Sequence, residues 1–306
     1  MSVHGKENFE AHIYLDHHYP PVQWNIVRGA FCSPSCLEES KTHGLLSISM
    51  ASMLSNETSD RLVSEMWLEE LRRDHYPENV SRLSGIFVFD DLDSLAQLWE
   101  NNNWGEHFQD EYLADVGVSA DRSSRVDSNW IADIIGNDGK LLNGWEVAAH
   151  NYWQGVPYPN KRPVWERIVE GHITVWSMDS KQEALKDIEA IWPQSLNILR
   201  YAVLCAGYGS LDGQTFPIVL TKEDRIELVY CLRLVQRGDH AFIDSLKEFI
   251  ESNPHLNCGI HCEGEESMPD LRGYSRVITP ESAGGFGDFV KHVLEMKKEY
   301  LQNTGI

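Results

Sequence analysis

The sequence predicts an α+β fold, with a mostly antiparallel mixed part at residues 1–178 and a mostly helical part at residues 179–306. Short apolar or alternating runs separated by turn residues are typical of strands, and they recur through the first part. From about residue 180, apolar side chains recur instead at the spacing of a helical face. This change of pattern predicts a domain boundary near residues 178–182.

Apolar runs predict the elements of the first part. "AHIYL" predicts a strand that stops before Pro20-Pro21, and "HITVW" predicts another over residues 172–176. Between them, residues 57–75 have helical spacing, and Pro77 ends that helix. The other predicted elements are a strand in "SRLSGIFVFDD" at 81–91, a helix from Leu92 to Trp99 capped by Asp90 or Asp91, and strand-like runs at "EYLADVGV" and "RVDSNWIADI".

The second part is expected to be mostly helical. The predicted helices lie at residues 180–191, 194–206, 222–237, 240–252 and 284–302. Thr221 with Asp224 resembles a capping box at the start of the third helix, and Gly238 is a typical stop.

The charge balance limits the partners of the chain. Its 306 residues carry a net charge of −21. A surface this acidic repels bare phosphate backbones, so tight non-specific binding of DNA or RNA is not expected. A local basic pocket, or a nucleic acid brought by a partner, stays possible.

No metal site is predicted from the cysteines. "CSPSC" and "CGIHC" have three residues between their cysteines, whereas common zinc knuckles have two. His261 beside Cys262 leaves a zinc site as the less favoured alternative. The histidines of "DHHYP" and "HLNCGIHC" are expected to be solvated in polar loops.

The N-terminal "MSVHGKENFEAH" has neither a basic nor an apolar signal region. No window approaches the roughly 18 apolar residues of a membrane span. We therefore expect a cytoplasmic protein with reduced thiols and no membrane partner.

Several familiar catalytic motifs are missing. "GGFGDF" at 284–289 is not the dinucleotide fingerprint, and no predicted strand precedes it. The sequence also has no Walker lysine loop, no Gly-x-Ser-x-Gly elbow and no His-Glu-x-x-His helix. The adjacent pairs Glu69-Glu70 and Asp90-Asp91 do not resemble carboxylates that face each other across a substrate.

Glu166 is the carboxylate with the most unusual surroundings. It lies in "PVWERIVEGHITV", among apolar residues and at the mouth of a predicted strand. It is either a solvated side chain at a strand edge or a catalytic carboxylate held on a rigid element.

The order of several short motifs carries a family resemblance. "HYPENVSRLSGIFVF" is followed by "RVDSNWI", then by "AAHNYWQG" and then by "PVWERIVEGHITV". This succession resembles the phage- and bacterium-borne ADP-ribosyltransferase-like domains of largely uncharacterised function. In those, a Ser-Arg strand precedes Asp-x-Asn-Trp, Tyr-Trp-x-Gly and Trp-Glu elements. The resemblance covers residues of about 9–178 and implies a split antiparallel sheet.

The resemblance implies NAD as the substrate and gives each motif residue a role. Glu166 would stabilise the cationic ribose, as carboxylates do in glycosidases. The resemblance also implies that His12 contacts the ribose or the phosphate, with Arg28 as the alternative cation of the first strand. Ser81 and Arg82 would contact NAD phosphate. Tyr152 or Trp153 would contact the nicotinamide ring. Structural alternatives are that Tyr152 and Trp153 are core residues, that Arg82 pairs with an acidic helix, and that Asp127 and Asn129 stabilise a turn.

The function so implied is transfer of ADP-ribose from NAD to a macromolecule, either protein or nucleic acid, by a toxin or a phage-defence factor. The alternatives are a non-catalytic binding module on the same fold and an NAD glycohydrolase. The helical part is expected to bind a partner, such as an antitoxin or a regulatory protein, or to cover the active site.

Overall fold

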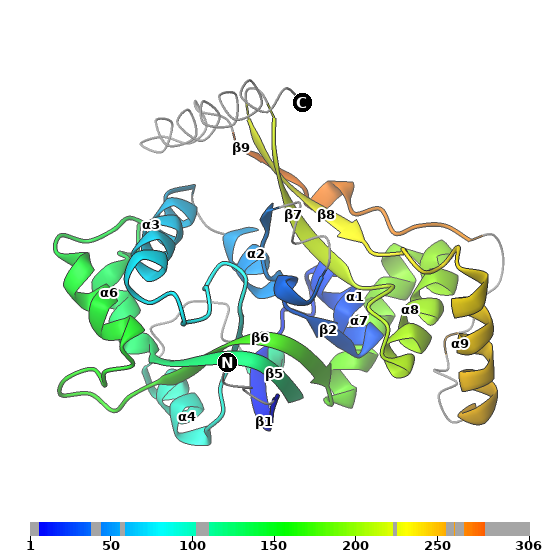
Figure 1. Cartoon of the computed structure of the whole chain (residues 1–306), viewed down its shortest axis with the longest axis horizontal. Coiled ribbons are helices and arrows are strands. Elements are labelled where there is room, and N and C mark those ends of the chain that lie inside the picture. Colours follow the sequence, from blue (N-terminus) through cyan, green and yellow to red (C-terminus); the bar gives the residue numbers. More distant parts are fainter. Residues whose placement is uncertain are drawn as a thin grey trace.

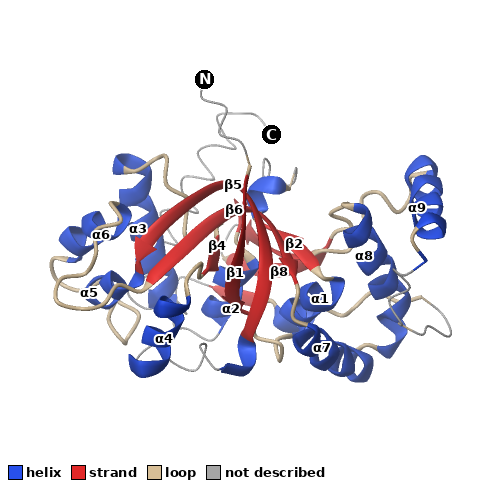
Figure 2. Cartoon of the chain, turned by 90° about the horizontal axis from the view of Figure 1, so that it is seen from below, coloured by secondary structure: helices blue, strands red, loops and turns tan. Residues whose placement is uncertain are grey.

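Two antiparallel sheets form the centre of the molecule in the computed structural model, which describes residues 6–37, 44–55, 59–101, 110–222, 225–254, 260 and 266–278. In Figures 1 and 2, helices α3 and α6 lie at one end of the long axis and α7, α8 and α9 at the other, with the strands between them. The described residues therefore form a mixed α/β structure with antiparallel sheets, as the sequence predicts.

The first sheet is built around two long strands. Its strands are β1 (Glu7–Tyr14), β2 (Ala30–Cys32), β4 (Ile86–Val88), β5 (Leu113–Asp127) and β6 (Trp165–Val175). β5 pairs with β1 on one edge and with β6 on the other, and a register shift between Ala120 and Arg122 bends it. The predicted strand over residues 172–176 is confirmed as the second half of β6.

β6 has two short strands along its other edge. β4 pairs with residues 167–169 and β2 with residues 172–174. One residue beyond β4, Phe89 exchanges two backbone hydrogen bonds of 2.8 Å with His12 of β1. The sheet therefore curls until β4 meets β1, which brings the start of β6 into the interior.

The second sheet corrects one predicted helix. Its strands are β3 (Gly44–Leu45), β7 (Thr215–Thr221), β8 (Ile226–Leu232) and β9 (Arg276–Ile278). The helix predicted at 222–237 is wrong, because residues 226–232 pair with the whole length of β7. A short apolar run fits either period, and here its β-branched and aromatic residues, with Leu228 and Tyr230 buried, favour a strand.

Most other helices match their predicted positions. The described helices are α1 (Pro20–Arg28), α2 (Ile48–Ser55), α3 (Ser59–His75), α4 (Leu92–Asn101), α5 (Ile131–Ile134), α6 (Trp145–Trp153), α7 (Met178–Ile191), α8 (Leu196–Tyr208) and α9 (His240–Ser252). α1 was not predicted, because Pro20-Pro21 starts this helix rather than only ending the preceding strand. The helix predicted at 284–302 lies outside the described residues.

Polar and apolar contacts cross the predicted boundary near residue 178. Trp24 of α1 donates to the Gly213 carbonyl at 2.8 Å, and Asn25 exchanges hydrogen bonds with the backbone of Thr215. The largest hydrophobic core likewise combines residues of α1 and the first sheet with residues of α7 and α8. None of the helices in the described ranges is both long and apolar enough to span a membrane.

Candidate functional site

Glu166 lies inside the protein at the start of β6. It is opposite Val126 of β5, and only 7% of the residue is exposed. β6 is paired on both sides near this point, so it is not an edge strand. The solvated alternative for Glu166 is therefore wrong, and a buried carboxylate requires compensating partners.

Arg82 links Glu166 to a second buried carboxylate. Its Nε and Nη2 donate to the two carboxylate oxygens of Glu65 at 2.8 and 3.0 Å. Its Nη1 donates to the Tyr152 hydroxyl at 2.6 Å and lies 3.7 Å from Oε2 of Glu166. Arg61 also binds Glu65, at 2.9 Å. The alternative in which Arg82 pairs with an acidic helix is thus confirmed.

These residues, which we call the Glu166 cluster, come from four separate segments. Arg61 and Glu65 are one turn apart on α3, and Tyr152 lies on α6. Arg82 lies in the turn before β4, where a side chain at Gly85 would collide with Ile168 of β6. Close packing of that turn onto β6 therefore aims Arg82 at the carboxylate.

Asp127 fixes the path of the chain into β6. This fully buried side chain accepts from the backbone N–H groups of Asn129, Tyr158 and Val164, at 3.1, 2.7 and 3.0 Å. Asn129 also donates its side-chain amide to Asp127. The expectation that Asp127 and Asn129 stabilise a turn is confirmed.

The carboxylates of Glu65 and Glu166 have different pKa values because Arg82 forms closer contacts with Glu65 than with Glu166. Burial would raise the pKa of Glu65, but Arg82 and Arg61 outweigh it and lower that pKa to about 2. Burial raises the pKa of Glu166 to about 7, with only partial compensation from Arg82 and a further rise caused by Glu65. Glu166 is thus a carboxylate poised to change its proton near neutral pH.

Tyr152 and Trp153 lie in the core. Tyr152 is 0% exposed and Trp153 is 3% exposed, and their rings meet edge to face at 4.9 Å. They pack with residues such as Leu68 and Ile134. Neither ring has a face on which nicotinamide would stack, so the core alternative holds for both rings.

The segment at the end of β4 separates His12 from Glu166. Its Nδ1 is 2.8 Å from the carboxylate of Asp115 on the neighbouring strand. Phe89, which bridges to His12, follows the Val88–Arg167 pair of β4 and β6. His12 is therefore about 10 Å from the start of β6 across two strand spacings.

Arg28 and Ser81 have structural partners. Arg28 ends α1 instead of lying on the first strand, and its guanidinium donates to the carbonyls of Asp212, Ala30 and Ser210. Burial lowers the pKa of Arg28 to about 10. The Ser81 hydroxyl accepts from the Leu83 N–H at 3.1 Å, which closes the turn that carries Arg82.

Glu65 and Arg61 were not predicted as part of any site. The only signal is that Glu65 falls on the apolar face of its helix, between Leu62 and Leu68, where a carboxylate requires a partner. An Arg–Glu pair one turn apart is usually a solvated surface pair, so sequence spacing alone does not reveal it.

Among the described residues, two groups of side chains elsewhere have the composition of metal ligands. In each, one ligand atom per residue lies within 4.8 Å of the others: His17, His18 and Glu111, and Cys36, Asp121 and His172. A hydrogen bond from Cys32 and the neighbouring His172 lower the pKa of the Cys36 thiol to about 4. Most of "HLNCGIHC", including Cys258 and Cys262, lies outside the described residues.

A family model described as "Protein of unknown function (DUF2441)" matches residues 35–189, which is just over half of the chain. No curated protein sequence matches the chain. The matched range contains the whole Glu166 cluster, whereas His12 and Arg28 precede it. The chain belongs to the DUF2441 family.

Proposed function

We propose that the chain transfers ADP-ribose from NAD to a macromolecular acceptor and that Glu166 is its catalytic carboxylate. The observation that carries this proposal is the incomplete neutralisation of Glu166, which is buried 3.7 Å from an arginine already bound to another carboxylate. In a structural ion pair the two charges usually neutralise each other. A catalytic carboxylate more often keeps a charge that its neighbours do not fully neutralise, which shifts its pKa. The antiparallel pairing around β6 supports the antiparallel character of the sheet that the family resemblance implies.

The reaction requires a negative group at this point. The bond between C1′ of the ribose and the nicotinamide nitrogen breaks, and its electron pair leaves with nicotinamide. C1′ then carries oxocarbenium-like positive charge until an acceptor atom bonds to it and releases a proton. A carboxylate in a low-dielectric interior stabilises this charge more strongly than a solvated one, because little water screens it.

Arg82 and Glu65 would act as positioning residues in this scheme. Glu65 holds the guanidinium through two hydrogen bonds, which fixes the distance from Nη1 to Glu166. Arg28, Tyr152 and Trp153 are engaged in the core, so the proposal assigns them no contact with NAD. The acceptor is a protein or a nucleic acid, and the net charge of −21 favours a protein.

A second candidate is a non-catalytic binding module on the same fold. It is favoured by the burial of the Glu166 cluster, in which Glu65 and Tyr152 are both 0% exposed. In this case the cluster stabilises the fold, and no substrate reaches Glu166.

The experiment that separates the two uses NAD labelled on its adenosine part. The purified chain and its Glu166→Gln variant are incubated with labelled NAD and a cell lysate, and free nicotinamide is measured together with the label in protein, DNA and RNA. Glu170→Gln is the matched control, because Glu170 lies on the same strand and binds Arg122 near the surface.

Transfer by the wild type and by Glu170→Gln, with loss in Glu166→Gln, supports the transferase and names the acceptor class. Release of nicotinamide without transferred label would replace it with hydrolysis of NAD. No use of NAD by the wild type contradicts the proposal and favours the binding module.

A further inference from the structure

Two adjacent histidines lie where the chain passes from β1 to α1. The Asp16 carboxylate accepts from the His18 N–H at 2.9 Å, and the Asp16 carbonyl accepts from the Tyr19 N–H. These bonds shape the turn that carries His17 and His18. The sequence pattern suggested solvated histidines, but His17 is only 7% exposed, so this expectation is wrong for His17.

Glu111 reaches the same place from a different segment. It belongs to a short 3-10 turn (Asp110–Tyr112) just before β5. The Leu15 N–H donates to the Tyr112 carbonyl at 2.7 Å, which holds this turn beside the histidine turn. The Tyr112 ring also packs edge to face against both imidazoles. Backbone contacts therefore hold the two segments together without help from Glu111.

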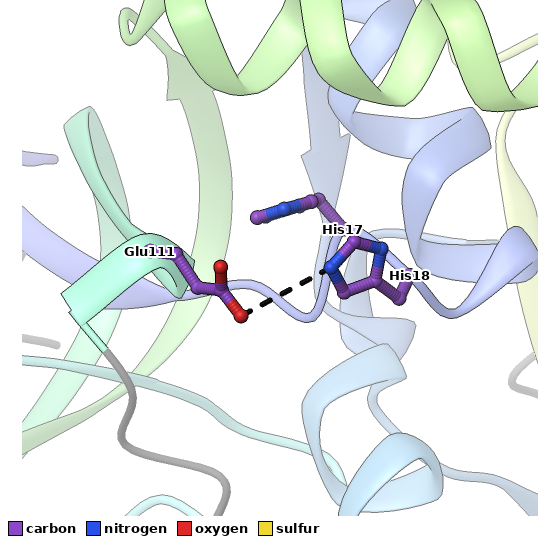
Figure 3. A group of neighbouring side chains, drawn as sticks. All are labelled: His17, His18 and Glu111. Carbon is purple, nitrogen blue, oxygen red and sulfur yellow. Dashed lines mark ion pairs between the residues drawn. The ribbon is translucent and has the colours of Figure 1, made fainter.

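Figure 3 shows the three side chains close together, with a dashed line for the ion pair between His18 and Glu111. Nε2 of His18 is 4.0 Å from the Glu111 carboxylate, which is too long for a hydrogen bond. Nδ1 of His17 is buried and has no hydrogen-bond partner among the described residues. One ligand atom from each residue lies within 4.8 Å of the others.

These distances fit an ion between the side chains better than direct contact. Two ligand atoms at about 2.0–2.1 Å from a tetrahedral zinc are about 3.3 Å apart. His18 and Glu111 have side chains that are 58% and 54% exposed, so both are free to move inward by the remaining distance, which is at most about 1.5 Å. His17 would not need to move from its packed position.

A fourth side chain lies beside His18. Nδ1 of His18 is 3.6 Å from Oδ2 of Asp187 on α7, and that oxygen also accepts from the Gln23 amide at 2.7 Å. A carboxylate on one imidazole nitrogen directs the other nitrogen toward a metal. Asp16 and Glu183 add negative charge nearby, and Lys186 is paired with Glu183.

We propose that His17, His18 and Glu111 bind a divalent transition-metal ion, with zinc as the first candidate, and that Asp187 positions His18. Two imidazoles and one carboxylate are the protein ligands of many zinc sites that keep a fourth position open for water. The same set also suits Fe²⁺ and related ions. This site is separate from the Glu166 cluster, so its test does not depend on ADP-ribosyl transfer.

The test measures zinc binding by titration calorimetry after treatment with a chelator. Every protein carries Cys36→Ser, which removes the thiolate from the group of Cys36, Asp121 and His172. This reference protein is compared with its His18→Ala, Glu111→Gln and Asp187→Asn variants. Glu189→Gln is the matched control, because Glu189 is exposed on the same helix as Asp187 and is not part of the group. Co²⁺ replaces Zn²⁺ in a second titration, since its visible absorption reports the coordination geometry.

We expect the reference and Glu189→Gln to bind one zinc ion per chain with equal affinity. His18→Ala and Glu111→Gln each remove a ligand and should weaken binding by more than about tenfold, while Asp187→Asn should weaken it by about tenfold. Because His18 and Glu111 are exposed, these variants do not threaten the fold. A reference protein that binds no zinc, or variants that bind as well as Glu189→Gln, would overturn the proposal.

Discussion

Nη1 of Arg82 lies 3.7 Å from the Glu166 carboxylate, while Nε and Nη2 of the same guanidinium are bound to Glu65. The Arg82 guanidinium therefore contacts two buried carboxylates, and its contacts with Glu65 are shorter than its contact with Glu166. The pKa of Glu65 falls to about 2 and that of Glu166 rises to about 7 as a result. The inequality leaves Glu166 as the carboxylate whose proton is exchanged near neutral pH, and the first three predictions below follow from it.

The first prediction concerns stability and pH. A carboxyl group with a raised pKa in the folded state binds more protons there than in the unfolded chain, so it reduces stability as pH rises. For Glu166 the loss should occur between about pH 4.5, its ordinary pKa, and pH 7. At about 1.4 kcal/mol per pKa unit it amounts to about 3 kcal/mol.

Urea unfolding of the wild type and Glu166→Gln at pH 5 and pH 8 measures this effect. The unfolding free energy of Glu166→Gln should fall less over this range than that of the wild type. Equal changes in the two proteins would show that Glu166 titrates normally.

A second prediction concerns Glu65, which lies between Arg61 and Arg82 with 0% exposure. Glu65→Gln leaves the buried Arg82 and the half-buried Arg61 underneutralised and should lower the unfolding free energy by about 3–5 kcal/mol. Glu70→Gln, at an exposed position of the same helix, should change it by less than about 0.5 kcal/mol. A small effect of Glu65→Gln would show that water reaches the Glu166 cluster.

The third prediction uses the Tyr152 hydroxyl. Tyr152→Phe removes the acceptor of Nη1 of Arg82, so this nitrogen should turn to Glu166 and lower the pKa of Glu166. The midpoint of the pH–activity profile should then move below that of the wild type. The unfolding free energy should fall by about 1–3 kcal/mol if the donor stays partly unsatisfied. Tyr158→Phe, which affects an exposed bond to Asp133, should leave the midpoint unchanged.

The fourth prediction concerns the thiol of Cys36. The hydrogen bond from Cys32 and the proximity of His172 favour its thiolate form. Iodoacetamide at pH 6 should therefore modify Cys36 before Cys205 and Cys231, whose pKa values are raised by burial. Peptide mass mapping identifies the modified residue, and His172→Ala should slow its reaction. Faster labelling of Cys231 would contradict the assigned environment.

Strong local patterns allowed much of the fold to be predicted. The helical spacing of residues 57–75 and 240–252 led to α3 and α9, because one apolar face was enough to define each helix. The start of β6 also followed from apolar neighbours, whereas the burial of Tyr152 supports the structural alternative and not the contact with nicotinamide that the resemblance implies. By contrast, residues 226–232 were too short for their period to separate a strand from a helix, and pairing with β7 decided the outcome.

The composition of the Glu166 cluster depends on contacts that sequence spacing does not encode. Glu166 and Arg82 were identified through the order of motifs, but Glu65 became a member only because α3 packs over the turn at Arg82. Arg28 moved from a predicted strand to the end of α1, since prolines also favour the first turn of a helix. His17 became buried through Tyr112, which is distant in sequence.

The most direct test of the central claim is the initial rate of ADP-ribosyl transfer at pH 6 and pH 8 for the wild type, Glu166→Gln and Glu170→Gln. If ionised Glu166 stabilises the cationic ribose, the wild-type rate should rise with a midpoint near pH 7. Glu166→Gln should lose about a hundredfold or more at pH 8, and Glu170→Gln should match the wild type. Equal rates for the wild type and Glu166→Gln would contradict the account, and Glu166 would then be a structural partner of Arg82.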